Sequence, residues 1–299
     1  MRSLFLLVCL ACDAATLEKP DPHRIVQRSV EAIETDWSQA PNYAFQERDV
    51  QSKRDGAPVI KTYEVLMIDG SQYNRLIAVD DKPLLPGDQM EEERKLRAEM
   101  NKRARESPRE SAKRIAKYQK ERDQDHAMLK NMVEAFDFQL AGEEIVNGYD
   151  CWVLDATPKR GYQPKDRETK VLTGMRGRLW VDKSQNQWVK VKAEVIKPVS
   201  LFGFFAKVGP GTRFQLEQAP VADNLWLPSH FSMRVNASAF GFINEDSSDD
   251  ETYGKYVATG KATAVVPGER GEFKNSGIHE LKNAGGASRA RKPLAAFCR

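Results

Sequence analysis

The side chains that most often carry catalysis are scattered along this sequence. The four histidines lie at positions 23, 126, 230 and 279, and no two have the i, i+4 spacing that sets two imidazoles on one helix face for zinc. Ser229 and His230 are adjacent in a strand-like run, so their side chains point to opposite faces and cannot act as nucleophile and base. The sequence contains neither G-x-S-x-G nor a phosphate-binding glycine loop.

We therefore predict a protein that is not an enzyme, with no catalytic residue, no cofactor and no metal site. The acidic runs Glu91–Glu93 and Asp246–Glu251 lack the spaced oxygen ligands and the turn glycine of a calcium loop, and we expect them to be solvated surface. An active site assembled from dispersed residues is the alternative that no sequence motif would reveal.

Composition limits the class of protein. The 299 residues carry 46 Lys plus Arg and 43 Asp plus Glu, a formal charge of +3, and 30% of the chain is charged. This excludes a transmembrane bundle, and the interleaving of both signs argues against nucleic acid as a partner. Four cysteines are too few for a disulfide-stapled scaffold or a zinc ribbon. The hydrophobic content of 40% is sufficient for one sizeable core.

Residues 1–14 have the pattern of a signal peptide. A positive charge precedes the apolar run Leu4–Leu10, and small residues follow at the positions that a signal peptidase recognises. The run is too short for a permanent membrane span, which takes about 20 apolar residues. We expect a periplasmic protein; lipoprotein processing at Cys12, which would give a lipid-anchored form, is the alternative. Among the remaining cysteines we expect Cys151 to be buried in a strand, and a disulfide with Cys298 stays open.

The first elements after this signal follow from hydrophobic periodicity. Apolar residues recur at helical spacing over 23–38, between two prolines, which predicts an amphipathic helix. From Tyr43 the period changes to two. The runs 43–51, 58–69 and 71–80 are separated by turn residues and predict three strands in an antiparallel meander.

The stretch 88–126 is dense in charges of both signs and predicts a helical insertion, which continues to residue 135. Ser107, Pro108 and Glu110 have the form of a capping box with proline at the first helical position, so one helix should end and another begin there. Because the acidic residues nearly cancel the basic ones, we expect solvated helices joined by salt bridges rather than a surface for RNA.

From residue 137 the sequence predicts strand after strand. Asn147-Gly148 is a strong hairpin signal, because both positions of the turn need a positive φ. Short turns between consecutive strands require an antiparallel sheet, and we expect the acidic run 244–250 to be one of these connections. The expected strands are 137–146, 149–157, 172–182, 187–197, 211–219, 225–238 and 251–264.

These elements predict a mainly β, α+β domain over residues 23–264. The expected architecture is an unclosed antiparallel β-barrel, or half barrel, of about nine to eleven strands with helices as a lid. Residues 265–299 lose apolar density and predict an extended or disordered basic tail.

Alternation within the strands predicts one continuous apolar face. In the strand 187–197, for example, Val189 and Val191 fall on one face, and Trp188 and Lys190 on the other. The helices available to cover this face are few, which favours an apolar cavity for a ligand; the alternative is that the apolar side chains pack on one another and on the helices. The predicted cavity residues are Leu179, Val181, Val189, Val191, Val195, Phe214, Leu216, Phe231, Met233 and Val235.

The segment 199–206 is unusually apolar for a connection between strands. Leu201, Phe202, Phe204 and Phe205 surround Gly203. Such a loop could insert into lipid or close the mouth of the cavity. The alternative is a plug that folds back onto the core.

Several local sequences resemble the bacterial outer-membrane lipoprotein-sorting protein family, which includes LolA-like and LolB-like proteins and, similarly, the RseB sensor domain. They are Gly148–Leu154, Arg178–Asp182, Val191–Glu194 and Leu225–Pro228. The resemblance covers most of residues 23–264 and implies a half barrel with a helical lid over a cavity that receives acyl chains. It also implies that an arginine on an early strand holds the lid, and Arg48 is the matching candidate. The charged insertion and the basic tail differ from the compact carriers.

The expected function is thus that of an exported binding protein that holds lipid acyl chains, or the lipid moiety of a lipoprotein, without covalent chemistry. Peripheral contact with a membrane would accompany it. The alternative is an envelope interaction or stress-sensing protein that uses the same fold to bind a protein partner.

Overall fold

A computed structural model describes residues 20–259, except 54–55, 167–168, 201–205 and 240–242. The signal peptide predicted over 1–14, the modification at Cys12 and the tail predicted over 265–299 lie outside the described residues. The apolar loop residues Leu201, Phe202, Phe204 and Phe205 also lie outside them.

Three α-helices form where the sequence predicts them. Helix α1 (Pro22–Gln39) has Asp21 as its N-cap, whose side chain accepts a hydrogen bond from the backbone N–H of His23, and a short 3-10 helix, η1 (Ala40–Asn42), follows. Helices α2 (Pro86–Ala104) and α3 (Pro108–Ala135) form the charged insertion. The capping box of Ser107 and Glu110 at the start of α3 is confirmed.

The remaining described elements are strands and one further 3-10 helix, η2 (Thr169–Gly174). The strands are β1 (Tyr43–Lys53), β2 (Val59–Ile68), β3 (Ser71–Val79), β4 (Lys82–Pro83), β5 (Phe136–Val146), β6 (Tyr149–Pro158), β7 (Met175–Asp182), β8 (Trp188–Val195), β9 (Val199–Ser200), β10 (Ala206–Val208), β11 (Arg213–Ala222), β12 (Leu225–Ala239) and β13 (Ile243–Ala258). Asn147 and Gly148 both have positive φ, as the predicted β5–β6 hairpin requires.

The strands form one antiparallel sheet that does not close. Its order is β4-β3-β2-β1-β13-β12-β11-β8-β7-β6-β5, and the short strands β9 and β10 join beside β12. The predicted α+β half barrel with helices is therefore confirmed. The first and last long strands, β1 and β13, pair with each other in the interior of the sheet. The order begins with β4 and ends with β5, so these two strands are the edges.

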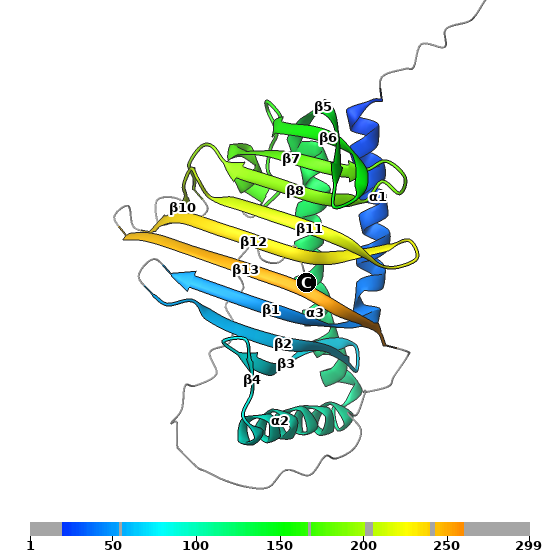
Figure 1. Cartoon of the computed structure of the whole chain (residues 1–299), viewed down its shortest axis with the longest axis vertical. Helices are drawn as coiled ribbons and strands as arrows, with labels where there is room; N and C mark the ends of the chain where they lie inside the picture. The colour runs from blue at the N-terminus through cyan, green and yellow to red at the C-terminus, as the bar shows by residue number, and fades with distance from the viewer. Residues whose placement is uncertain (1–19, 54–55, 167–168, 201–205, 240–242, 260–299) are drawn as a thin grey trace, which may run out of the picture.

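The charged insertion connects these two edges. Helix α3 has 28 residues and so spans about 42 Å, enough to cross the sheet. It contacts β3 near one edge and η2 near the other, and it lies beside α1. Figure 1 shows α1 and α3 running across the same side of the sheet, with α2 beyond β3. We call this side the helix face and the other side the opposite face.

The acidic run 244–250 is not a connection, and this prediction is wrong. It lies in β13, which pairs with β12 on one side and with β1 on the other. Segments rich in Asp and Ser have low strand propensity, but pairing with β12 along the whole run, and with β1 from Ser247 onward, overrides it. Asp249 and Glu251 are buried at 4% and 2% exposure, so the expectation of solvated surface fails for them too.

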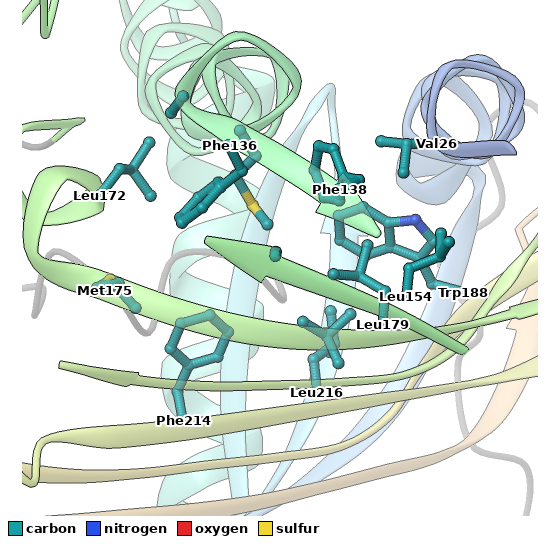
Figure 2. Packing of buried hydrophobic residues seen from close by; sticks show 14 of the residues in the cluster. Val26, Phe136, Phe138, Leu154, Leu172, Met175, Leu179, Trp188, Phe214 and Leu216 are labelled. Carbon is teal, nitrogen blue, oxygen red and sulfur yellow. The ribbon is translucent and has the colours of Figure 1, made fainter. Parts of the chain in front are cut away.

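The core lies between the helix face and the helices. Leu154, Leu179, Val191, Leu216 and Phe231 follow one another across five adjacent strands in direct register. All five belong to one buried hydrophobic cluster. Figure 2 shows how Phe136 and Phe138 of β5 lie between this sheet and the helices, with Val26 of α1 nearby. The predicted continuous apolar face therefore exists.

Candidate functional site

Most of the predicted cavity residues meet on the helix face. Eight of them belong to the buried cluster, and Val235 packs against it. The eight are Leu179, Val181, Val191, Val195, Phe214, Leu216, Phe231 and Met233. Their exposed fractions run from 0% to 8%, so in this arrangement the helices and neighbouring side chains cover them.

Val189 does not share this face, contrary to the prediction. It lies in a second cluster with Cys151, Val153, Trp180 and Trp226. The register shifts between β7 and β8 here: Trp180 pairs with Lys190, but the next residue, Val181, pairs with Trp188. This bulge gives β8 one extra residue and reverses the alternation beyond it.

Because of this bulge, Trp188 points to the helix face instead of the polar side that simple alternation predicts. Its side chain belongs to the main cluster, and Figure 2 places it beside Phe138 and Leu154. The indole Nε1–H donates to the Ser29 hydroxyl of α1 over 2.9 Å, and both residues are buried. This hydrogen bond attaches α1 to the sheet at a point that the sequence did not reveal.

The cover over the apolar face comes from three elements. Ile25, Val26 and Ile33 of α1 enter the cluster, and so do Met132 and Ala135 at the end of α3. The 3-10 helix η2 adds further apolar side chains, although the sequence predicted that segment as the beginning of a strand. The cover is therefore more complete than the count of predicted helices suggested.

Polar contacts join the two helices of this cover. The Arg122 guanidinium of α3 lies 4.1 Å from the ring centroid of Trp37 in α1 and donates to the Trp37 carbonyl oxygen. Lys130 of α3 forms an ion pair of 2.9 Å with Glu34 of α1. The imidazole ring of His126 in α3 stacks on the indole ring of Trp37 at a centroid distance of 5.2 Å. These contacts hold α1 to α3 as one layer.

Asp36 is a buried carboxylic acid in the last turn of α1. Its exposed fraction is 2%, and burial raises the pKa of its carboxyl group from 3.8 to about 6. The backbone of Trp226 and the side chain of Gln187 lie close enough to offset part of this increase in pKa, yet neither reaches good hydrogen-bond geometry with the carboxyl oxygens. The charged form of Asp36 is thus disfavoured where α1 meets the sheet.

Arg48, the candidate for holding the lid, contacts a different part of the fold. Its guanidinium forms two hydrogen bonds, of 2.6 and 2.7 Å, with Asp81 in the turn after β3. Its neighbour Asp49 is buried on the helix face, so Arg48 lies on the opposite face. The lid role that the resemblance implied for Arg48 therefore has no support in this geometry.

Arginines of the insertion attach it to the β2–β3 turn instead. Arg103 of α2 is buried and donates to the carbonyl oxygens of Ile68 and Ser71 over 2.7 and 2.9 Å. Arg114 of α3 donates to the Asp69 carbonyl oxygen over 3.0 Å and to the Ser71 hydroxyl over 2.8 Å. The prediction of solvated charged helices is wrong for these two side chains, because carbonyl oxygens of the β2–β3 turn accept their hydrogen bonds. Ion pairs along the two helices are present as predicted.

Three carboxylates that are far apart in the sequence meet on the helix face. Oxygens of Glu47, Asp49 and Glu251 lie within 4.8 Å of one another, and all three residues are buried. They are close because β1 and β13 are paired strands in which Asp49 lies directly opposite Glu251 and Glu47 is two residues before Asp49. Oxygen ligands of this kind suit a hard cation, but the Tyr253 hydroxyl already donates to Glu251 and Gln51 donates to Asp49, so we assign no metal to them.

The structure also bears on the predicted burial of Cys151 and on membrane-spanning helices. Cys151 is buried in β6 as predicted, and burial raises the pKa of its thiol to about 11, so it is a structural rather than a reactive cysteine. Among the residues that the structure describes, no helix combines the length and the apolar character needed to cross a membrane.

Comparisons with solved structures find similar folds at low identity. The chain is 12% identical to a LolA superfamily protein from Nitrosomonas europaea, with a TM-score of 0.32 over 80% of this chain and 93% of that one. A DUF1329 family protein from Desulfovibrio piger gives 13% identity and a TM-score of 0.35 over 82% and 96%. The MucA/MucB complex of Pseudomonas aeruginosa gives 12% and 0.23 over 79% and 95%.

No family model and no curated protein matches the chain.

Proposed function

We propose that this chain is an exported, non-catalytic binding protein of the bacterial envelope that holds an acyl chain of a lipid or a lipoprotein. The acyl chain would lie between the helix face of the sheet and the layer formed by α1 and the end of α3. The observation that carries this proposal is the apolar face itself, which extends in register across five strands and is covered by separate helices.

The energetics allow an acyl chain to replace part of this cover. Displacing α1 would expose Ile25, Val26 and Ile33, which costs about 5 to 9 kcal/mol at about 1.5 to 3 kcal/mol for each side chain. Burying a palmitoyl chain contributes about 12 kcal/mol at about 0.8 kcal/mol per methylene, before the cost of ordering it. The two terms are similar in size, so uptake and release by movement of α1 are both accessible.

The hydrogen bonding of α1 is consistent with such a movement. The strands of the sheet are joined to each other by ladders of backbone hydrogen bonds, whereas α1 meets the sheet mainly through side chains. The Ser29–Trp188 hydrogen bond and the buried Asp36 are the polar features at this boundary. Opening at this boundary breaks no backbone ladder, which favours local opening here over separation of the strands.

Native mass spectrometry after gentle extraction tests the proposal. The wild-type protein should carry an added mass that corresponds to an acyl lipid. Met233→Asp places a charge on the apolar face and should abolish the added mass, whereas Ser232→Asp, the neighbouring residue in β12 on the opposite face, should retain it. An unchanged lipid load on folded Met233→Asp protein would contradict the proposal.

A second candidate function is binding of a protein partner in the envelope, as an interaction or sensing protein. One observation favours it: the opposite face carries a hollow of about 860 Å³ among charged side chains. A lipid-free protein that is isolated with a stoichiometric protein partner would support this candidate over the first.

A further inference from the structure

A hollow of about 860 Å³ extends across seven strands of the sheet, in the order β5, β6, β7, β8, β11, β12 and β13. The side chains that line it include Arg178, Lys192, Gln215 and Ser232. These four residues are successive cross-strand partners in the register of β7, β8, β11 and β12. Each is adjacent in its strand to a residue that is buried on the helix face, such as Leu179 or Val191. Because side chains alternate along a strand, the hollow lies on the opposite face, away from the proposed acyl site.

The register brings like charges together in this hollow. Arg178 pairs directly with Lys192 across β7 and β8, and Arg213 pairs directly with Arg234 across β11 and β12. Directly opposed side chains in antiparallel strands have Cβ atoms about 5 Å apart, so each pair starts two cationic side chains from neighbouring positions. The guanidinium of Arg178 then reaches Asp155, and that of Arg213 reaches Glu194. Such pairs oppose folding, and their cost falls when an anion binds between them.

Acidic residues neutralise only part of this charge. Asp155 accepts two hydrogen bonds from Arg178, of 2.7 and 3.0 Å. Glu194 accepts from Arg176 and from Arg213, each over 3.2 Å, and these two bonds lower the pKa of its carboxyl group.

Two cations of the hollow lack such a partner. Lys192 and Arg234 are exposed, and no carboxylate among the described residues forms an ion pair with either of them. Five cationic side chains, Arg176 among them, line the hollow with four carboxylates. These are Asp155, Glu194, Asp250, which also contacts His230, and Asp249, which is buried. We call the five the cationic groove: Arg176, Arg178, Lys192, Arg213 and Arg234.

The spacing of the charges favours an extended polypeptide. The two like-charge pairs are separated by two strand spacings across the sheet and two residues along it, which is roughly 12 Å. In an extended chain, two carboxylates about four residues apart span a similar distance. Gln215 lies between the two pairs and keeps its amide oxygen for the backbone of such a chain, since its amide N–H already donates to Glu217. Glu194 lies on the other side of the same diagonal, where it accepts from Arg176 and Arg213. A recess among strands also suits a peptide better than a flat bilayer surface.

We propose that the cationic groove binds an acidic, extended segment of a partner protein, whose two carboxylates meet the Arg178/Lys192 pair and the Arg213/Arg234 pair. Recognition would be electrostatic, with the side chain of Gln215 beside the main chain of the segment between the pairs. This inference does not rest on the acyl-chain proposal, because the two surfaces lie on opposite faces of the sheet.

Fluorescence anisotropy with a labelled peptide tests the groove. The probe is a Gly/Ser/Thr peptide of about 12 residues with two Glu four positions apart, and the control probe has Gln in their place. The Glu peptide should bind the full chain and lose affinity as salt rises, and the Gln peptide should bind at least about tenfold more weakly. Equal affinity for the two peptides would overturn the proposal.

Charge reversal locates the binding. Lys192→Glu with Arg234→Glu should weaken binding of the Glu peptide at least about tenfold. Arg105→Glu with Lys113→Glu, the same charge change at exposed positions of the charged insertion, should alter binding less than about twofold. Circular dichroism verifies folding, and the milder Lys192→Gln with Arg234→Gln variant gives the same readout should the reversal unfold the chain. Wild-type affinity in a folded groove variant would overturn the proposal.

Phosphatidylglycerol vesicles distinguish a membrane surface as the occupant. Should vesicle binding depend on Lys192 and Arg234 while peptide binding does not, the groove recognises lipid headgroups and the proposal fails. Loss of peptide binding in the groove variants together with normal palmitate uptake would support the groove and leave the acyl proposal intact. The reverse pattern, groove intact and palmitate uptake absent, would refute only the acyl proposal.

Discussion

The buried carboxyl group of Asp36 predicts how the stability of the protein changes with pH. Its pKa is about 6 in the folded chain against 3.8 for the unperturbed group, because burial in the last turn of α1 disfavours the charged form. Between these two values the folded state binds more protons than the unfolded state, so the free energy of unfolding falls as pH rises. The pKa difference corresponds to about 3 kcal/mol, lost by about pH 7.

Asp36→Asn isolates this contribution, because asparagine has nearly the same shape and does not titrate. Urea unfolding followed by tryptophan fluorescence gives the free energy of unfolding at several pH values. The variant should gain about 3 kcal/mol relative to wild type between about pH 4 and about pH 7. Glu34, Glu194 and Glu217, whose pKa values are lowered by ion pairs, produce the opposite trend in both proteins and cancel in the difference.

A difference between variant and wild type that stays constant over this pH range would refute the reasoning. It would mean that Asp36 is solvated, or that its carboxylate has better donors than the structure shows. A confirmed slope would show that ionisation of Asp36 at the boundary between α1 and the sheet destabilises the fold as the pH rises through about 6.

Three further substitutions have defined outcomes in the same unfolding assay. Ser29→Ala leaves the buried indole N–H of Trp188 without its acceptor and should cost about 1 to 3 kcal/mol, while palmitate uptake becomes faster. Arg103→Ala removes the donors to the β2–β3 turn and should cost about 2 to 4 kcal/mol. Gly148→Ala, at a φ of +88°, should cost about 1 kcal/mol although its surroundings leave room for a methyl group.

Each of these three has a matched control in the chain. Ser38→Ala removes an exposed hydroxyl from the same helix as Ser29, and Lys102→Ala removes an exposed ion pair beside Arg103. Gly56→Ala also places a methyl group in open space but at an ordinary φ. All three controls should change the free energy of unfolding by less than about 0.5 kcal/mol. A control as damaging as its partner would contradict the assigned contact.

Local signals in the sequence were sufficient for several elements. Asn147 and Gly148 predict their hairpin because the conformational requirement of the turn involves only those two residues. Ser107 and Glu110 predict the start of α3 for a similar reason, since a capping box is complete within one helical turn.

What the sequence could not reveal depends on neighbours that are distant along the chain. The acidic part of β13 becomes a strand because β1 and β12 pair with it, and nothing within the run itself signals this. The bulge that separates Val189 from Trp188 requires knowledge of the opposing strand β7. Strict alternation therefore assigned both residues to the wrong faces.

For the candidate site, the sequence predicted the apolar face but not the elements that cover it. Alternation predicted the apolar face, because nine of the ten predicted cavity residues belong to the buried cluster or pack against it, and only Val189 does not. It could not show that Phe136, Phe138 and η2 cover that face, nor that Arg178 and Lys192 meet across two strands. Contacts of this kind depend on the register between strands, and the sequence of one strand alone does not indicate that register.

The central claim is that an acyl chain enters between the helix face and α1, and the methionine methyl groups of the protein can report it directly. Met175 and Met233 belong to the buried cluster, whereas Met90 is 70% exposed on α2. In NMR spectra of methyl-labelled protein, a nitroxide-labelled fatty acid should broaden the signals of Met175 and Met233 and spare that of Met90. Equal broadening of all three signals, or none at saturating fatty acid, would contradict the account.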